Sequence, residues 1–347
     1  MARREGVFPI TCYLVNRRQT MATTLRFSAN INTFNACADR YVLSGYGERL
    51  TTEELIKAAT QVEGLTGVEV VGLWHVNDDN LEQMHRQIKD AGLEVTCVTP
   101  DIWASGKWGW GSFAANDPQI RRDAIHEVKK SMEWAKQLNC EVVDLWFGQD
   151  GYDYPLQADY LAAWDRIIEG TIECAEHVPE VKLVIEYKPK EPRTHCFIGT
   201  VGKTLLLVEK VNKPNVGAMI DVGHALMAYE NAAESAAMLQ YFGQKLFYMH
   251  FNDNWRLWDD DMTVGSVHTV EMLELLYWLD RMGYNGWYAL DIFPYREDGI
   301  RAATESICWI KGLYGLLDEI GRDRIAQVIA SGDAMEASAM IREALLG

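Results

Sequence analysis

The sequence has no long apolar run, few basic residues and no paired-cysteine motif, and each absence excludes a class of protein. A membrane helix needs roughly 18–20 uncharged apolar residues, and no segment approaches that length, so we expect no membrane partner. The 33 Lys and Arg residues are outnumbered by 50 Asp and Glu, which gives a net charge of −17. Because nucleic-acid backbones are held by a surplus of basic residues, we expect no nucleic-acid partner.

The seven cysteines are scattered and odd in number. Several lie in apolar runs, as Cys97 does in VTCV, which favours reduced, buried thiols and a cytoplasmic location. The first residues do not form a secretory signal, because their apolar run is short and Arg17 and Arg18 follow it at once. We therefore expect residues 1–23 to be a disordered N-terminal extension.

From Leu25 onward, short β-rich runs alternate with longer amphipathic stretches. Strands are expected in the runs LRFSANI, GVEVVGLW, EVTCVT, EVVDLWF, KLVIEY, VGAMID, LFYMHF and WYALDIF. Helices are expected at residues 52–62, 81–91, 118–138, 158–177, 200–211, 233–242, 270–282 and 300–317. Eight strands, each followed by a helix, predict the α/β class and a closed (β/α)8 TIM barrel over residues 24–320. Residues 321–347 have a helical pattern with no further strand, which predicts a C-terminal helical arm.

Four consecutive strand runs each have a side chain that can bind a metal at or near the C-terminal end. These side chains are Glu186, Asp221, His250 and Asp291. In a barrel the C-terminal ends of the strands converge on one face, where catalytic residues are found. Any one of these residues alone has a structural explanation, but four unpaired polar groups on successive buried strands would be costly. Three carboxylates and one imidazole predict a site for Mn2+, Mg2+ or Co2+.

A second set of polar residues follows these strand ends. His224 comes three residues after Asp221, and the run WDDDM places Asp259, Asp260 and Asp261 shortly after His250. The alternate members Asp259 and Asp261, completed by His224, predict a second metal ion on the same face. The alternative for this run is a solvated acidic loop.

Lys188 and His75 are candidates for the chemistry itself. Lys188 lies two residues after Glu186 and therefore faces the same way, so that it can stabilise an oxygen on which charge develops. His75, at the end of the second strand run, is a candidate base for opening a cyclic sugar, helped by Asp78 or Asp79. A structural histidine is the alternative there.

Two tryptophans at neighbouring strand ends are candidate substrate contacts. Trp146 lies near the end of the fourth strand run and Trp103 follows the third. Flat apolar side chains suit the C–H face of a sugar, although each tryptophan alone could also serve packing.

The segments that carry these residues resemble the xylose isomerase family. IEYKPKEPR is similar to the family's glutamate–lysine motif, AMIDVGH to its bridging-carboxylate segment, and KLFYMHFND with DDDMTVG to its seventh strand and second-metal loop. FAANDPQIRR and YNGWYALDIFPYRED resemble the segments after the third strand and around the last one. The resemblance implies catalytic roles for Lys188, His75 and Asp259, and substrate contacts for Trp146, Trp103, Lys188 and His224.

The departures from that family are specific. This chain has Asp221 where xylose isomerases carry Glu, and His250 where they carry Asp. The resulting set is similar to the rhamnose isomerase branch and to the ketose 3-epimerases, but the epimerases carry Glu on the last strand and use paired glutamates. Lys188, His224 and the Asp259–Asp261 loop favour isomerisation instead.

The resemblance implies a metal-promoted hydride shift between C1 and C2 of an unphosphorylated monosaccharide, with two divalent ions, in a homo-oligomer (a dimer or tetramer). The alternatives left open are a ketose 3-epimerase, a phosphodiesterase related to AP endonucleases, and a non-catalytic sugar-binding barrel.

Overall fold

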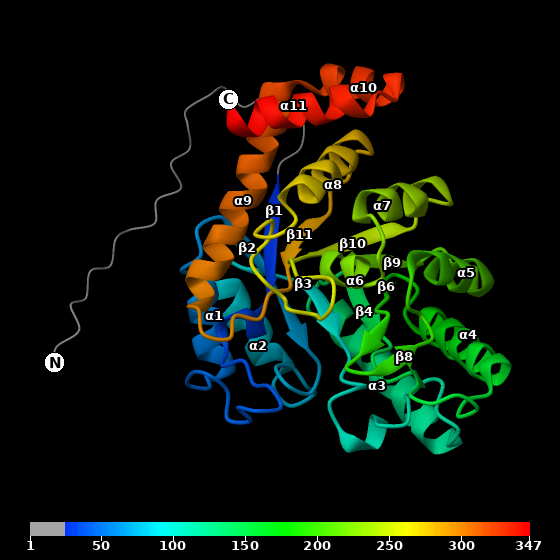
Figure 1. Cartoon of the computed structure of the whole chain (residues 1–347). Coiled ribbons are helices and arrows are strands. Elements are labelled where there is room, and N and C mark those ends of the chain that lie inside the picture. Colours follow the sequence, from blue (N-terminus) through cyan, green and yellow to red (C-terminus); the bar gives the residue numbers. More distant parts are fainter. Residues whose placement is uncertain (1–24) are drawn as a thin grey trace.

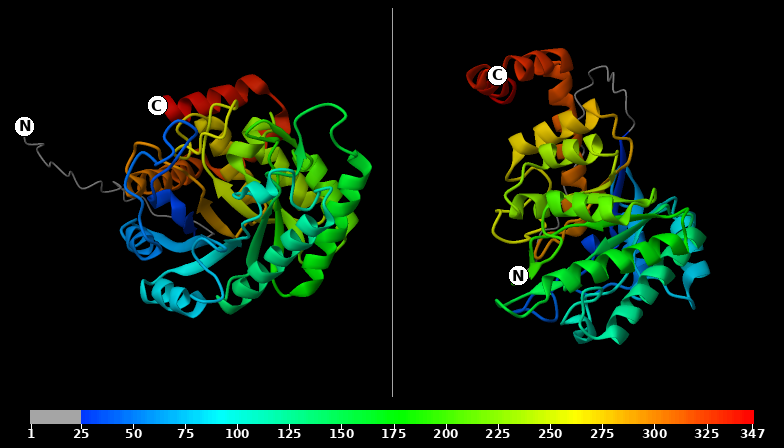
Figure 2. Two further views of the ribbon diagram at one scale, coloured as in Figure 1. Left: turned by 90° about the horizontal axis from the view of Figure 1, so that it is seen from below. Right: turned by 90° about the vertical axis from the view of Figure 1, so that its right-hand side faces the viewer.

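The computed structural model describes residues 25–347, and in this part of the chain eight parallel strands close into a barrel (Figures 1 and 2). The expected N-terminal extension, residues 1–23, lies outside the described residues. The barrel strands are β1 (Arg26–Asn30), β2 (Leu65–Val71), β3 (Glu94–Thr99), β4 (Val142–Trp146), β6 (Lys182–Glu186), β9 (Val216–Asp221), β10 (Leu246–Phe251) and β11 (Trp287–Leu290). They pair in chain order, and β1 closes the ring against β11. The predicted TIM barrel is confirmed.

The strands are apolar because each is covered on both sides. Their inward side chains meet in one cluster, made of Cys97, Val142, Val184, Met219, Tyr248 and Ala289, and their outward side chains pack under the helices. All six residues of β9 are buried. Such two-sided burial produces the continuous apolar runs from which the strands are predicted. For β3, β9 and β10 the predicted first and last residues are those of the structure.

The helices lie on the outside of the barrel, as Figure 2 shows. They are α1 (Thr52–Ala59), α2 (Leu81–Asp90), α3 (Pro118–Gln137), α4 (Tyr160–His177), α5 (Val201–Val211), α6 (Val222–Met227), α7 (Ala232–Tyr241), α8 (Thr269–Arg281), α9 (Gly299–Ile320), α10 (Arg322–Ser331) and α11 (Ala334–Leu346). Their starts are encoded locally. Thr51 and Glu54 form a reciprocal capping box at α1, and Asp117 caps α3 with Pro118 in its first turn.

A small antiparallel sheet beside the barrel mouth is not predicted from the sequence. It consists of β5 (Gly151–Tyr152), β8 (Thr194–Cys196) and β7 (Lys190–Glu191), in that order. Two short 3-10 helices, η1 (Ile31–Phe34) and η2 (Gly106–Trp108), also lie in loops. The β7–β8 hairpin folds the segment after β6 back on itself, and the backbone N–H of Lys188 bonds to the carbonyl of Ile198 at 3.2 Å. The hairpin therefore holds Lys188 close to the end of β6.

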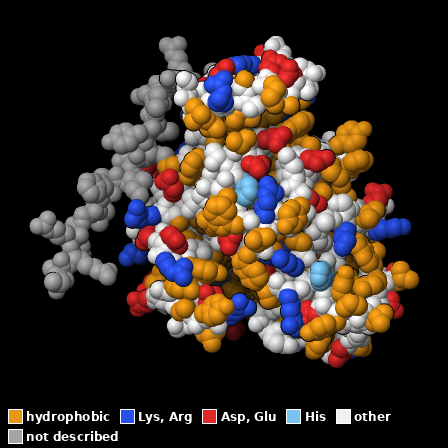
Figure 3. Space-filling model, in the orientation of Figure 1, with side chains coloured by type: hydrophobic (Ala, Val, Ile, Leu, Met, Phe, Trp, Pro, Cys, Tyr) orange, Lys and Arg blue, Asp and Glu red, His pale blue; other side chains and the backbone are white. Residues whose placement is uncertain are grey.

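The last two helices form an arm at one end of the molecule, beyond the barrel (Figures 1 and 2). They pack against α9 and against each other, and they bury Ile325, Val328 and Met340. Among the described residues, no helix is both long and apolar enough to cross a bilayer. Figure 3 shows acidic, basic and hydrophobic side chains interspersed over one face of the molecule.

The cysteines agree only in part with the expectation of reduced, buried thiols. Cys97, Cys140, Cys174 and Cys196 are free and buried, and Cys37 is free and partly exposed. Burial raises the pKa of the Cys140 thiol to about 12, so this group stays protonated and unreactive.

Candidate active site

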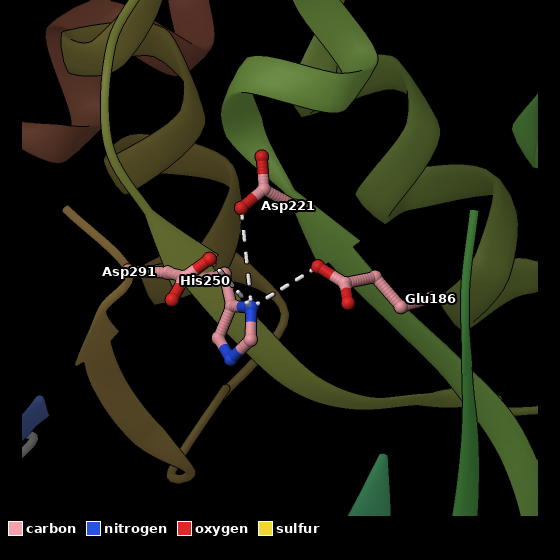
Figure 4. Close-up of side chains that lie close together, drawn as sticks. All are labelled: Glu186, Asp221, His250 and Asp291. Atoms are coloured by element: carbon pink, nitrogen blue, oxygen red, sulfur yellow. Dashed lines mark hydrogen bonds and ion pairs between the residues drawn. The ribbon is translucent and has the colours of Figure 1, made fainter. Parts of the chain in front are cut away.

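The four predicted strand-end ligands come together at the mouth of the barrel. Glu186 ends β6, Asp221 ends β9, His250 is the fifth residue of β10, and Asp291 follows β11. Each offers one ligand atom, and these atoms all lie within 4.8 Å of one another. The Nδ1 atom of His250 lies 3.1 Å from Oε1 of Glu186, 3.9 Å from Oδ2 of Asp221 and 3.8 Å from Oδ2 of Asp291 (Figure 4).

The four side chains crowd negative charge into a buried space. Burial raises the pKa of Asp221 to about 6 and the pKa of Asp291 to about 7. Burial also opposes ionisation of Glu186, but the neighbouring His250 outweighs it and lowers the pKa of Glu186. A divalent cation among these groups would favour their charged forms, which is the chemistry this set of donors suits.

A second group shares Asp221 with the first. Ligand atoms of Asp221, His224 and Asp259 also lie within 4.8 Å of one another. Nε2 of His224 lies 3.1 Å from Oδ2 of Asp259, and Nζ of Lys188 lies 2.7 Å from the same oxygen. Burial alone would lower the pKa of His224, but the charges of Asp221 and Asp259 raise it to about 9. Asp221 is therefore placed between two candidate metal sites.

Two atoms of this second group are buried without a hydrogen-bond partner. They are Nδ1 of His224 and Oδ1 of Asp259. Buried polar atoms nearly always have a hydrogen-bond partner, and a site for a metal ion is one explanation for an exception. Both atoms are ligand types for a divalent metal, so the residues present fit a second ion.

Asp261 is placed beside this second group rather than in it. Its Oδ1 accepts a hydrogen bond from Nδ2 of Asn252 at 3.2 Å. Burial and the neighbouring Asp259 charge raise its pKa well above the ordinary value. The structure thus brings together six of the seven predicted ligands in two groups, with the seventh adjacent to them.

His75 has hydrogen bonds at both ring nitrogens. The backbone N–H of Val71 donates to Nδ1 at 2.9 Å, so Nε2 carries the proton and bonds to Oδ1 of Asn32 at 3.2 Å. Burial lowers the pKa of His75 to about 4. Its expected helpers face elsewhere: Asp78 accepts from Trp134 and pairs with Lys130, and Asp79 is exposed. This geometry favours the structural alternative for His75.

The two candidate tryptophans line one side of the site. Trp146 is paired with Glu186 across the β4–β6 ladder, and Nζ of Lys188 lies 5.1 Å from the centre of its ring. The ring of Trp103 meets that of Trp146 edge-on, with centroids 5.1 Å apart. The indole Nε1 of Trp146 is buried and has no hydrogen-bond partner. Trp146 is therefore next to Glu186 and Lys188, and Trp103 is next to Trp146.

Two carboxylates under the site are not predicted from the sequence. Glu69 of β2 lies below His250, with its Oε2 3.1 Å from Nε2 of the imidazole and its Oε1 accepting from the Tyr248 hydroxyl at 2.8 Å. Asp144 of β4 is fully buried, and burial, strengthened by the charge of Glu186, raises its pKa well above the ordinary value. Glu69 and Asp144 interrupt apolar runs as Glu186 does, and that signal could have found them.

Comparison with known proteins places the chain in a family. Residues 56–313 match the family described as the xylose isomerase-like TIM barrel. The chain belongs to this family. The match covers most of the barrel, and all the candidate metal ligands lie within it.

Solved structures similar to this xylose isomerase-like chain include several sugar epimerases. A D-tagatose 3-epimerase-like protein superposes with a TM-score of 0.64 at 20% identity, covering 85% of this chain and 99% of its own. An L-ribulose 3-epimerase superposes with a TM-score of 0.65 at 14% identity, covering 88% and 98%. A 3-keto-D-glucoside 4-epimerase from E. coli gives a TM-score of 0.62 at 17% identity, covering 75% and 94%. At these identities the similarity shows the shared fold.

Proposed function

We propose that this protein is a divalent-metal-dependent aldose–ketose isomerase for an unphosphorylated sugar. The observation that supports this most directly is the second ligand group, which shares Asp221 with the first and is salt-bridged to Lys188. A single-ion site would need only the four strand-end residues. The additional group supports two ions side by side, because two of its buried ligand atoms make no hydrogen bond, and one of them, Nδ1 of His224, lies 3.5 Å from Oε1 of Glu186 in the first group.

The residues have separate tasks in this proposal. One ion would be held by the four strand-end residues Glu186, Asp221, His250 and Asp291. The other would be held by Asp221, His224 and Asp259, with Asp261 beside them. When bound, Mn2+, Mg2+ or Co2+ ions supply Lewis acidity that polarises the oxygens on C1 and C2, which favours a hydride shift between these carbons.

Lys188 would stabilise negative charge on a substrate oxygen. Burial alone would lower its pKa, but the charges of Asp259 and Glu191, both in direct contact with its ammonium group, raise it well above the ordinary value. Lys188 therefore stays protonated and acts as a fixed positive charge rather than as a base. The adjacent Trp146 offers an apolar face and a free indole N–H to the sugar.

The absence of a phosphate on the substrate is supported by the arginines near the site. Arg256, after β10, pairs with Glu271 at 3.1 Å, and Arg296, after β11, lies over the ring of Tyr46 at 4.5 Å. Both guanidinium groups are engaged away from the metal-binding residues, whereas a phosphate site needs free cations or exposed N–H groups.

A ketose 3-epimerase is the second candidate, since several similar structures are sugar epimerases. The two reactions differ in what moves. Epimerisation removes a proton from carbon and returns one, so the hydrogen on that carbon exchanges with solvent. A hydride shift carries the hydrogen directly between carbons without exchange.

The test is a sugar screen in D2O. Protein stripped by a chelator should be inactive toward pentoses, hexoses and 6-deoxyhexoses, and Mn2+ or Co2+ should restore aldose–ketose interconversion without deuterium at C1 or C2. Deuterium at C3 of a ketose, with a 3-epimer as product, would assign the epimerase instead. Glu186→Ala should abolish the metal rescue, whereas Glu305→Ala, an exposed site on α9, should not. Metal-independent activity would contradict both candidates.

A further inference from the structure

A row of three indole rings leads from the candidate metal centre to the surface. Trp146 stands beside Glu186, and Trp103 contacts it with ring centroids 5.1 Å apart. Trp74, from the loop after β2, continues the row: its ring lies 6.0 Å from that of Trp103 at an interplanar angle of 48°. Trp103 and Trp146 are partly buried, but Trp74 is 46% exposed. The row therefore ends in an aromatic face open to solvent.

Trp74 is held in place by a carboxylate. Oδ2 of Asp101 accepts the indole N–H of Trp74 at 2.7 Å, and Oδ1 accepts the backbone N–H of Ala104 at 3.0 Å. The exposed ring is thus fixed relative to the loop that carries Trp103. A fixed ring loses little side-chain entropy when a ligand packs on it.

The backbone before Trp74 is strained, and burial does not explain this. Leu73 has a φ of +65°, in the left-handed region that a leucine rarely adopts, and its side chain is 49% exposed. The N–H of Leu73 bonds to the carbonyl of Val76 at 2.8 Å, and Gly72 forms an isolated bridge with Val76. This tight turn positions Trp74 at the barrel mouth. Strain of this kind clusters at ligand-binding sites.

We infer that Trp74 and Asp101 form a binding site for a second sugar ring, and that the substrate class includes reducing disaccharides. This inference rests on the proposed isomerase function. The hydroxyl on C1 must be free for the ring to open and the hydroxyl on C2 for the hydride shift, so the second ring is attached beyond C2, through O3, O4 or O6. The first ring then lies along Trp146 and Trp103. The C–H face of the second packs on Trp74, and its hydroxyls can donate to the oxygens of Asp101.

The test compares disaccharides with monosaccharides in the metal-loaded, full-length protein. The probes are 1→4-linked and 1→6-linked reducing disaccharides, together with the monosaccharide found most active. Trp74→Ala should lower the ratio of kcat/KM for the disaccharide to kcat/KM for the monosaccharide about tenfold, as the loss of one aromatic contact can. Asp101→Ala should lower the same ratio, because it frees the indole. Trp110→Ala, which removes an 82% exposed ring outside the row, is the matched control and should keep the wild-type ratio.

A binding measurement separates this inference from the proposed function. Calorimetry on the wild type and on Trp74→Ala needs no turnover, so it reports on the second-ring site even if no isomerase activity is found. Weaker disaccharide binding in Trp74→Ala, with a smaller change for the monosaccharide, supports the site whatever the reaction is. An unchanged ratio in both variants, or a wild type that binds the monosaccharide but none of the disaccharides, would overturn it.

Discussion

Glu69 orients the imidazole of His250 from the side opposite to the ligand group. Its carboxylate accepts from the Tyr248 hydroxyl and faces Nε2 of His250, which leaves Nδ1 directed at Glu186, Asp221 and Asp291. An imidazole that binds a metal through one nitrogen commonly donates the other N–H to a carboxylate, which fixes the ring and makes it a better ligand.

Glu69→Gln is therefore expected to weaken the affinity for the first ion by roughly 10–100-fold, although Glu69 is not a ligand itself. Competition with a fluorescent chelator measures this affinity. Glu63→Gln, an exposed change just before β2, is the control and should bind metal like the wild type. Equal affinities in the two variants would show that Glu69 serves packing alone.

His75 makes the stability of the protein depend on pH. Burial lowers its pKa to about 4 from an ordinary 6.5, so the folded state prefers the neutral ring while the unfolded state takes up the proton sooner. The stabilisation is present above pH 6.5 and is lost as the pH falls toward 4, by up to about 3 kcal/mol.

In His75→Gln we expect the free energy of unfolding to fall less between pH 6.5 and 4 than in the wild type. Urea titrations at several pH values in this window measure it. Parallel curves for the two proteins would mean that other groups carry the acid sensitivity. The same variant also tests the alternative role of His75 in ring opening. If His75 is structural, any loss of activity in His75→Gln should follow its loss of stability and should be equal for the cyclic and the open-chain form of the sugar.

The sequence predicts the residues at strand ends better than those beneath them. Glu186, Asp221, His250 and Asp291 are found because a polar group after a long apolar run marks the point where a buried strand reaches the surface. Glu69 and Asp144 interrupt such runs in the middle. In a strand covered on both sides, the pattern does not show whether a given position faces the barrel interior or the helices.

At the scale of elements, Asp253 organises the loop after β10. This fully buried carboxylate accepts the backbone N–H groups of Val267 and His268 at 2.8 and 2.9 Å and pairs with the His268 ring at 2.8 Å. Its own backbone exchanges two hydrogen bonds with Met262. These contacts close the loop that carries Asp259.

Asp253→Ala should reduce the number of tightly bound ions from two to one. The substitution removes no ligand, but it loosens the loop that carries Asp259. The second group should therefore lose affinity for its ion, whereas the strand-end group should keep its affinity. Metal titration followed by calorimetry gives the stoichiometry. Asp333→Ala, which removes the cap of α11 far along the chain, is the control and should retain two ions. Two ions of unchanged affinity in Asp253→Ala would contradict the role of the loop.

The long helices and strands are predictable because each has a hydrophobic period of its own and residues that mark its ends, such as helix caps. The small β5–β8–β7 sheet is not, because strands of two or three residues are too short to show an alternation. Its position depends on pairing between segments about 40 residues apart, such as Tyr152 with His195. Such pairing is a property of the folded chain rather than of either segment.

For the whole molecule, the barrel explains why residues far apart in sequence meet. Eight parallel strands end at the same rim, so side chains at successive ends converge whatever the loops between them contain. This is why a count of strands and a list of their last residues predict the strand-end group. The same reasoning does not predict what α10 and α11 pack against, because these helices lie beyond the barrel.

The arm formed by α10 and α11 buries little within one chain. Met340 is the one buried residue of α11, while Met335 is 73%, Leu345 42% and Leu346 81% exposed. On α10, Ile329 is 44% exposed. Isolated helices of this length are marginal in water and gain their stability from packing. We therefore predict that a second copy of the chain covers these apolar residues in a homo-oligomer.

Removing residues 321–347 should then lower the mass in sedimentation experiments to that of one chain. It should leave metal binding unchanged, because the ligands lie in the barrel. Met335→Asp with Leu346→Asp in the full chain tests the same surface without a truncation, since a buried charge without a partner would split an interface. Full-length protein that is already monomeric, or variants that keep its oligomeric mass, would show that the arm does not join the chains.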